Sequence, residues 1–348
     1  MNFKKYFKPT IIFLLIILIT FRSSYVFDGV KSGLKICFSS VIPALFPFMV
    51  LSGLFIGSMK FSNNSFVTKF SKKLFGISAY GSCAFLCGML CGFPIGAKCA
   101  VQLYEEGKIS HSEAETLIAC ANNSGPLFVV GALGMGILKS YKAGLLLYAV
   151  QICCAVLTAI MMKSVTYTKH IPVNNSFKKT SLTTSICDSV SNTLNVCGFI
   201  VFFAAIIKLA EPAMYFMPGS IKSICMGILE LTNGIYYVNY NFNDIWNKVI
   251  VSACLLSWSG ISVHMQVKSI IKNSGLSMKK YYFARTSMCV LAFIMTIILS
   301  GKAEIIICML PFPILRVIIF TLITTLILSM IYLRNKKITE KIEKKKTV

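Results

Sequence analysis

Long apolar segments, separated by short polar loops, follow one another along almost the whole chain. Segments of about 20 residues match the length of a helix that crosses the hydrocarbon core of a bilayer. With a first helix close to the N-terminus, the pattern predicts eight crossings. The other seven segments lie near residues 36–57, 118–138, 143–162, 187–208, 249–270, 281–300 and 312–333.

Two further apolar stretches, residues 79–104 and 213–238, contain turn-forming residues in their interiors. GFPIG at 92–96 interrupts the first, and Pro218-Gly219 and Asn233-Gly234 interrupt the second. Each arm of 79–104 is about a dozen residues long, enough to enter a membrane but not to span it. We therefore expect an all-α polytopic membrane protein with two broken or re-entrant hairpins.

Composition agrees with a membrane protein and excludes an ordinary soluble domain. The 348 residues have a mean hydropathy of +0.74, and only 14% of them are charged. The net charge of +23 comes from basic residues spread over short loops and the C-terminal tail. This spread fits topology signals and contacts with anionic lipid better than a nucleic-acid surface.

The basic loops predict which segments stay inside the cell. Lysines near the N-terminus, in the loops at 60–73 and 163–179, and in the tail at 334–348 place all four regions inside, so 79–104 should not cross. Residues 213–247 are then outside and the lysines at 268–280 inside. Four lysines would lie outside, against the rule: Lys31, Lys35, Lys139 and Lys142.

A faint internal repeat divides the chain into halves. Residues 46–55 resemble 198–207, GML at 88–90 resembles GIL at 227–229, and 119–128 resembles 253–262. Because the halves would enter the membrane from opposite sides, the pattern predicts the inverted repeat of many secondary transporters, with chance similarity as the alternative.

The predicted division of the chain begins with an N-terminal helix that resembles a signal peptide but lacks a small-x-small cleavage site, and so stays as an anchor. The regions are the anchor 1–34, the first repeat 35–162, a basic cytoplasmic loop 163–186, the second repeat 187–301, a last transmembrane helix 302–333 and a basic cytoplasmic tail 334–348.

The first candidate site is CGFPIGAK at 91–98. Gly92 and Gly96 allow a sharp turn, and Pro94 can open the second arm at its first helical position. The free amides of that arm and the charge of Lys98 favour an anionic or strongly hydrogen-bonding ligand. Alternatively, the glycines, with Gly88, form a packing face and Lys98 reaches the membrane interface.

The second candidate site is ANNSGP. Asn122, Asn123 and Ser124 precede Gly125-Pro126 and offer donors and acceptors suited to a nucleobase edge or ribose hydroxyls. The alternative is that they only cap a broken helix. Upstream, Ser110 and Glu113 form a capping box that predicts a helix start, with Glu113 and Glu115 solvated.

The second half contributes Glu230 and Asn233 from GILELTNG, and Ser257 from the segment that precedes SGISVHMQV. Glu230 could balance the charge of Lys98 or carry a coupling proton, or it could be an interfacial residue at a hairpin end. We expect His264 to be a hydrogen-bonded structural histidine.

No metal, disulfide or enzyme motif is predicted. The 14 cysteines include no CxxC pair, and Cys83, Cys87 and Cys91 at four-residue spacing fit helix packing better than a soft-metal path. The sequence has no phosphate loop, HExxH or hydrolase elbow, so we expect neither catalysis nor a cofactor.

Several motifs together resemble a known family. In order, CGFPIGAK, EEGKIS with the following EAE, ANNSGPLFVVGA, GILELTNG and SGISVHMQV followed by GLS are similar to sporulation integral membrane proteins of YlbJ type, in the nucleoside-recognition or Gate group. The resemblance covers about residues 35–300. It implies a mother-cell or outer forespore membrane protein needed for the spore cortex.

The function expected from the motifs and the resemblance is transport or sensing of a small polar solute, with a nucleoside-like molecule as one candidate. The alternative is a scaffold that does not transport and recruits cortex-synthesis proteins. Expected partners are membrane lipid, the solute, and either further copies of the chain or other sporulation membrane proteins.

Overall fold

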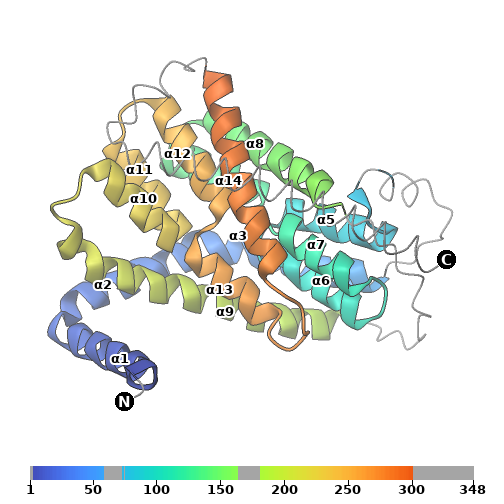
Figure 1. Cartoon of the computed structure of the whole chain (residues 1–348), viewed down its shortest axis with the longest axis horizontal. Helices are drawn as coiled ribbons and strands as arrows, with labels where there is room; N and C mark the ends of the chain where they lie inside the picture. Colours follow the sequence, from blue (N-terminus) through green and yellow to red (C-terminus); the bar gives the residue numbers. More distant parts are fainter. Residues whose placement is uncertain (1–2, 59–72, 74, 164–180, 301–348) are drawn as a thin grey trace.

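The structure, a computed structural model, describes residues 3–58, 73, 75–163 and 181–300. Within these ranges every regular element is a helix, as predicted (Figure 1). The predicted helix 312–333, the tail 334–348 and most of the basic loops at 60–73 and 163–179 lie outside the described residues.

Five helical segments of the described ranges are long and apolar enough to cross a membrane. α2 (Ser23–Ile36), η1 (Cys37–Val41) and α3 (Ile42–Ser58) form the first, which begins earlier than the predicted 36–57. The others are α8 (Tyr141–Met161), α9 (Leu182–Ala210) with η3 (Glu211–Met214), α12 (Ile245–Trp258) with α13 (Gly260–Ile270), and α14 (Lys279–Ser300).

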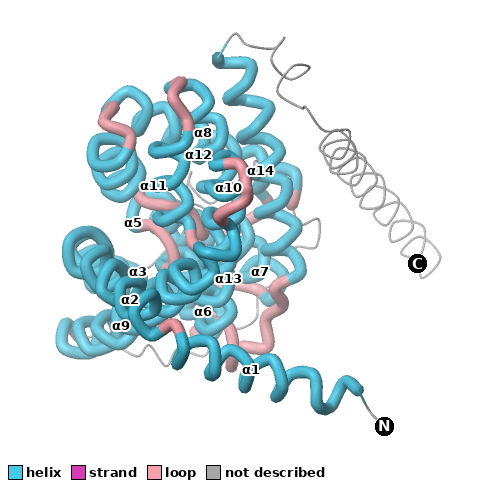
Figure 2. Tube along the Cα trace, turned by 90° about the vertical axis from the view of Figure 1, so that its left-hand side faces the viewer, coloured by secondary structure: helices cyan, strands magenta, loops and turns pink. Residues whose placement is uncertain are grey.

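The first predicted crossing is not among these five. α1 (Phe3–Phe21) contains Pro9, and its apolar part, Pro9–Phe21, is shorter than a typical span. It lies at one edge of the helical body (Figure 2). The total of eight crossings therefore stays a prediction.

Both predicted hairpins form. α5 (Ala79–Cys91) and α6 (Ile95–Glu105) pack together around a turn at 92–94, as GFPIG predicts. α10 (Gly219–Leu229) and α11 (Leu231–Asn241) form the second hairpin. Its break was predicted at Asn233-Gly234, and this is wrong: those residues continue α11, and the extended residue is Glu230, whose side chain caps α11.

Two predicted crossings are interrupted. Residues 121–126 separate α7 (His111–Cys120) from η2 (Leu127–Ile137), so 118–138 is not one continuous helix. α12 ends where Ser259 and Gly260 both adopt left-handed backbone, with φ of 75° and 76°. The two hairpins and the two interrupted helices leave four breaks in the helical backbone.

Close helix contacts hold these parts together. Gly29 and Gly33 of α2 lie directly against the α9 backbone, where a Cβ would come within 2.7 Å of Ala205 Cα and 2.9 Å of Val201 Cα. The first turns of α7 lie beside the loop after α13, since Glu115 of α7 accepts a hydrogen bond from the Ser277 amide at 3.0 Å. The topology prediction places both regions inside.

Candidate functional site between four helix breaks

The tip of the first hairpin docks on the break after α7. A Cβ at Gly88 or at Gly96 would overlap the carbonyl oxygen of Ala121, so only glycine allows this approach. Gly92 has φ of +88°, and a Cβ there would lie 2.9 Å from the Gly125 amide. The structure thus gives these three glycines the packing role that the sequence left open as an alternative.

The tip of the second hairpin docks on the break after α12 in a similar way. A Cβ at Gly260 would lie 3.2 Å from the Leu231 amide and 3.3 Å from the Gly227 carbonyl. Within the hairpin, Gly234 lies directly against Gly227. Each hairpin tip therefore contacts the break in the helix that follows it in sequence.

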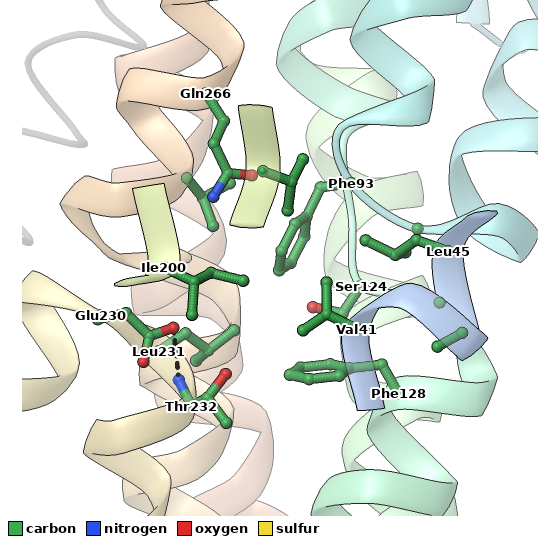
Figure 3. A pocket seen from close by; sticks show the side chains of 15 residues that line it. Val41, Leu45, Phe93, Ser124, Phe128, Ile200, Glu230, Leu231, Thr232 and Gln266 are labelled. Carbon is green, nitrogen blue, oxygen red and sulfur yellow. Dashed lines mark hydrogen bonds between the residues drawn. The ribbon is translucent and has the colours of Figure 1, made fainter. Parts of the chain in front are cut away.

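A small cavity of about 30 Å³ lies where these parts meet (Figure 3). One wall carries Phe93 of the first tip together with Ser124 and Phe128, and the facing wall carries Glu230 and Thr232 of the second tip. Gln266 of α13 also lines the cavity. This volume is large enough for an ordered water but too small for an organic solute, because one water needs about 10–15 Å³ by the same measure.

Glu230 is 3% exposed and fully hydrogen-bonded. Its carboxylate accepts from the backbone amides of Thr232 at 3.0 Å and Asn233 at 2.8 Å, and from Asn233 Nδ2 at 2.7 Å. These contacts cap the N-terminus of α11. Among the described residues Glu230 forms no ion pair with Lys98, which lines a different space.

The ANNSGP residues take three different roles. Asn123 donates from Nδ2 to the Cys120 carbonyl at 2.6 Å, which caps the end of α7 as in the alternative interpretation. Asn122 is fully buried near Tyr281 but makes no hydrogen bond of normal geometry. The buried Ser124 hydroxyl has no partner in the described part of the chain and lies at the cavity.

Arg285 of α14 is a central residue that the sequence analysis missed. It is 0% exposed. Its Nη2 donates to the Ala119 carbonyl at 3.2 Å, and its Nη1 lies 3.5 Å from the Ser257 carbonyl and 3.3 Å from Ser259 Oγ. No carboxylate pairs with it in the described ranges. A lone arginine inside the apolar segment 281–300 was the available signal.

Lys98 and Pro94 line a second, larger space, a cleft of about 420 Å³ between α6, α9 and α13. Lys98 lies one turn into α6, as predicted, but Pro94 is the residue before the helix and not its first residue. Gln266 lines both the cleft and the cavity. The ten predicted site residues therefore do not share one pocket: Gly92, Ser124 and Glu230 line the cavity, and Pro94 and Lys98 the cleft.

One curated relative is similar to the chain over about three quarters of its length. The sporulation integral membrane protein YlbJ of Bacillus subtilis (strain 168) is 27% identical over 319 residues, which cover 78% of this chain and 77% of the relative. The YlbJ-type resemblance is confirmed. No family model matches the chain, so the Gate assignment stays a prediction. No solved structure matches either.

The name of this relative agrees with the helices. YlbJ is by its name an integral membrane protein, and the five long apolar segments in the described part of the present chain support a multi-pass membrane location. Within the described ranges no group of three or more histidine, cysteine, aspartate or glutamate side chains is placed to hold a metal ion.

Three expectations about polar side chains have clear outcomes. Ser110 caps α7 as predicted, by accepting from the Glu113 amide at 3.2 Å. Glu113 was expected to be solvated, and this is wrong: its carboxylate accepts from the amide and hydroxyl of Ser78, both at 2.7 Å, and so joins α7 to the start of α5. His264 is structural, with Nδ1 3.0 Å from the Tyr281 hydroxyl.

Proposed function

We propose that this YlbJ-type protein acts in endospore formation by moving or sensing a small polar solute across the membrane. The observation that carries the proposal is the cavity at which two hairpin tips and two helix breaks meet. Inside a membrane such breaks are tolerated where they face protein or a water-filled space. The link to the spore cortex, and a nucleoside-like solute as candidate, follow from the family resemblance.

The order of the elements supports an inverted-repeat transporter architecture. α5–α6, α7–η2 and α8 have their counterparts in α10–α11, α12–α13 and α14. Two of the three weak sequence matches fall on these counterparts, because GML lies in α5 and GIL in α10, and residues 119–128 and 253–262 contain the two helix breaks. Solute sites of transporters with this architecture lie between the repeats, near the bilayer midplane.

A pair of serine substitutions tests the proposal. Ser124→Ala removes a cavity hydroxyl that makes no hydrogen bond, so membrane abundance should stay normal while the number of heat-resistant spores falls toward that of a deletion strain. Ser287→Ala is the matched control, because that hydroxyl is equally buried and unpaired within the described residues but lines neither space.

Normal spore counts in the Ser124→Ala strain would contradict a solute path through the cavity. If truncation of residues 334–348 were severe in the same assay, the scaffold alternative would gain the support that the transport proposal loses. A complete deletion that still builds a normal cortex would contradict both.

A further inference from the structure

Three helices turn polar faces toward the cleft. The lining residues follow one another at intervals of three or four within each helix, which places them on one face. They are Lys98, Gln102 and Glu105 of α6, Asp188, Asn192 and Asn195 of α9, and Gln266, Ser269 and Asn273 after or within α13. A volume of about 420 Å³ falls in the range of small-molecule sites.

The charged groups of the cleft make no direct contact with one another. Lys98 is partly buried, and the exposed Asp188 carboxylate faces the cleft from α9; neither makes a hydrogen bond or salt bridge with the described residues, but the two are close enough to interact through their charges. Glu105 adds a second acid at the exposed end. The negative charges of Asp188 and Glu105 disfavour the binding of a simple anion, and the positive charge of Lys98 disfavours the binding of a simple cation.

Gln266 is the buried polar group at the inner end of the cleft. Its side chain is only 3% exposed, its Nε2 reaches Ser262 Oγ at 3.3 Å, and its Oε1 has no partner among the described residues. A buried carbonyl oxygen without a donor is costly, by about 1–3 kcal/mol. A bound donor would remove this cost.

We propose that the cleft between α6, α9 and α13 binds a small zwitterionic solute of the amino-acid type. The anionic group of the solute pairs with Lys98, its cationic group pairs with Asp188, and the carboxamides of Gln266 and Asn195 bind its remaining polar atoms. The inference rests on the proposed function, since the cleft is then, by the predicted topology, the cytoplasmic end of a path that continues at Gln266 into the cavity.

Binding to the purified full-length protein in lipid nanodiscs tests the proposal. The probes are L-glutamine and L-serine as zwitterions, propionate as anion, propylamine as cation and uridine as neutral polar solute, each titrated against the thermal unfolding midpoint. We expect the zwitterions alone to raise the midpoint. Lys98→Met and Asp188→Asn should each raise the half-saturating concentration at least about tenfold, as expected for loss of one charge-assisted contact.

Lys142→Met is the control, because it removes the same charge at an exposed position outside the cleft. Zwitterion binding that survives both cleft variants, or no zwitterion binding, would overturn the inference. If uridine binds with unchanged affinity in both cleft variants, the cleft inference fails while the proposed function stands. If zwitterions bind as expected but Ser124→Ala strains sporulate normally, the cleft site stands and the proposed function fails.

Discussion

Arg285 Nη1 lies 3.3 Å from Asn123 Oδ1 and donates a hydrogen bond to it. This contact joins two breaks that are far apart in sequence, because the same guanidinium also contacts Ser257 and Ser259 at the C-terminal end of α12. A planar group with five donors can satisfy several freed carbonyls at once. Arg285 therefore acts as the common hydrogen-bond partner of both interrupted helices.

Replacement of Arg285 should destabilise the folded protein itself and not only impair its function. Hydrogen bonds to a charged donor contribute about 1.5–3 kcal/mol each. Arg285→Lys keeps the charge but loses the forked geometry, so we expect it to lower the thermal unfolding midpoint almost as much as Arg285→Met. Thr286→Ala, at a half-buried neighbouring position of the same helix, is the control. Equal midpoints for Arg285→Lys and wild type would contradict this role.

The glycines of the first hairpin should not tolerate even a methyl group. Gly88→Ala or Gly96→Ala places a Cβ on the Ala121 carbonyl, and overpacking of this kind costs about 1–3 kcal/mol. Membrane abundance and the unfolding midpoint should both fall. Gly198→Ala in α9 is the matched control, because a Cβ there meets nothing within 4 Å. If all three variants behave alike, the hairpin tip is not packed as described.

Glu230→Gln should loosen the tip of the second hairpin. The carboxylate accepts three hydrogen bonds, whereas a glutamine side chain has only one oxygen, and loss of a helix cap costs about 0.5–2 kcal/mol. Amide exchange at Thr232 and Asn233 should become faster. Glu105→Gln removes the same charge at an exposed position and should leave these amides unchanged. Unchanged exchange in Glu230→Gln would argue against the cap.

The topology prediction can be tested with single cysteines in a cysteine-free chain. Gly107 and Lys272 lie in the loops after α6 and after α13, which should both be inside, so cysteines there should resist a membrane-impermeant thiol reagent in intact cells. A cysteine at Phe216, which is 93% exposed, should react. Rapid labelling at Gly107 would show that the first hairpin crosses or that the chain is inverted.

Local sequence signals predicted much of the fold. The turn at GFPIG and the start of α7 at Ser110 were found because proline, glycine and capping residues act through their own backbone. The break at Glu230 was placed three residues too late. Asn233-Gly234 is a strong turn signal, but the Glu230 carboxylate binds the Asn233 amide and draws that pair into the helix.

The candidate site was less predictable, because it depends on contacts between distant segments. Lys98 and Glu230 were expected to form one site, yet they line different spaces on either side of Gln266. Arg285 lies 162 residues from Asn123, and nothing in its own segment indicates that it faces two helix breaks. Likewise, nothing in the sequence distinguishes Gln102, Asn192 and Asn273 from other polar residues. They line one cleft only because the folded helices place them together.

The Ala121 carbonyl, held between Gly88 and Gly96, has a mechanical consequence. Gly88 lies in α5 and Gly96 in α6, so the oxygen packs directly against both arms of the first hairpin. These arms cannot slide past α7 without a backbone clash. Any widening of the cavity for a solute should therefore carry α5, α6 and the end of α7 as one rigid body. The hinge must then lie elsewhere, at the opposite wall formed by α9, α13 and the second hairpin.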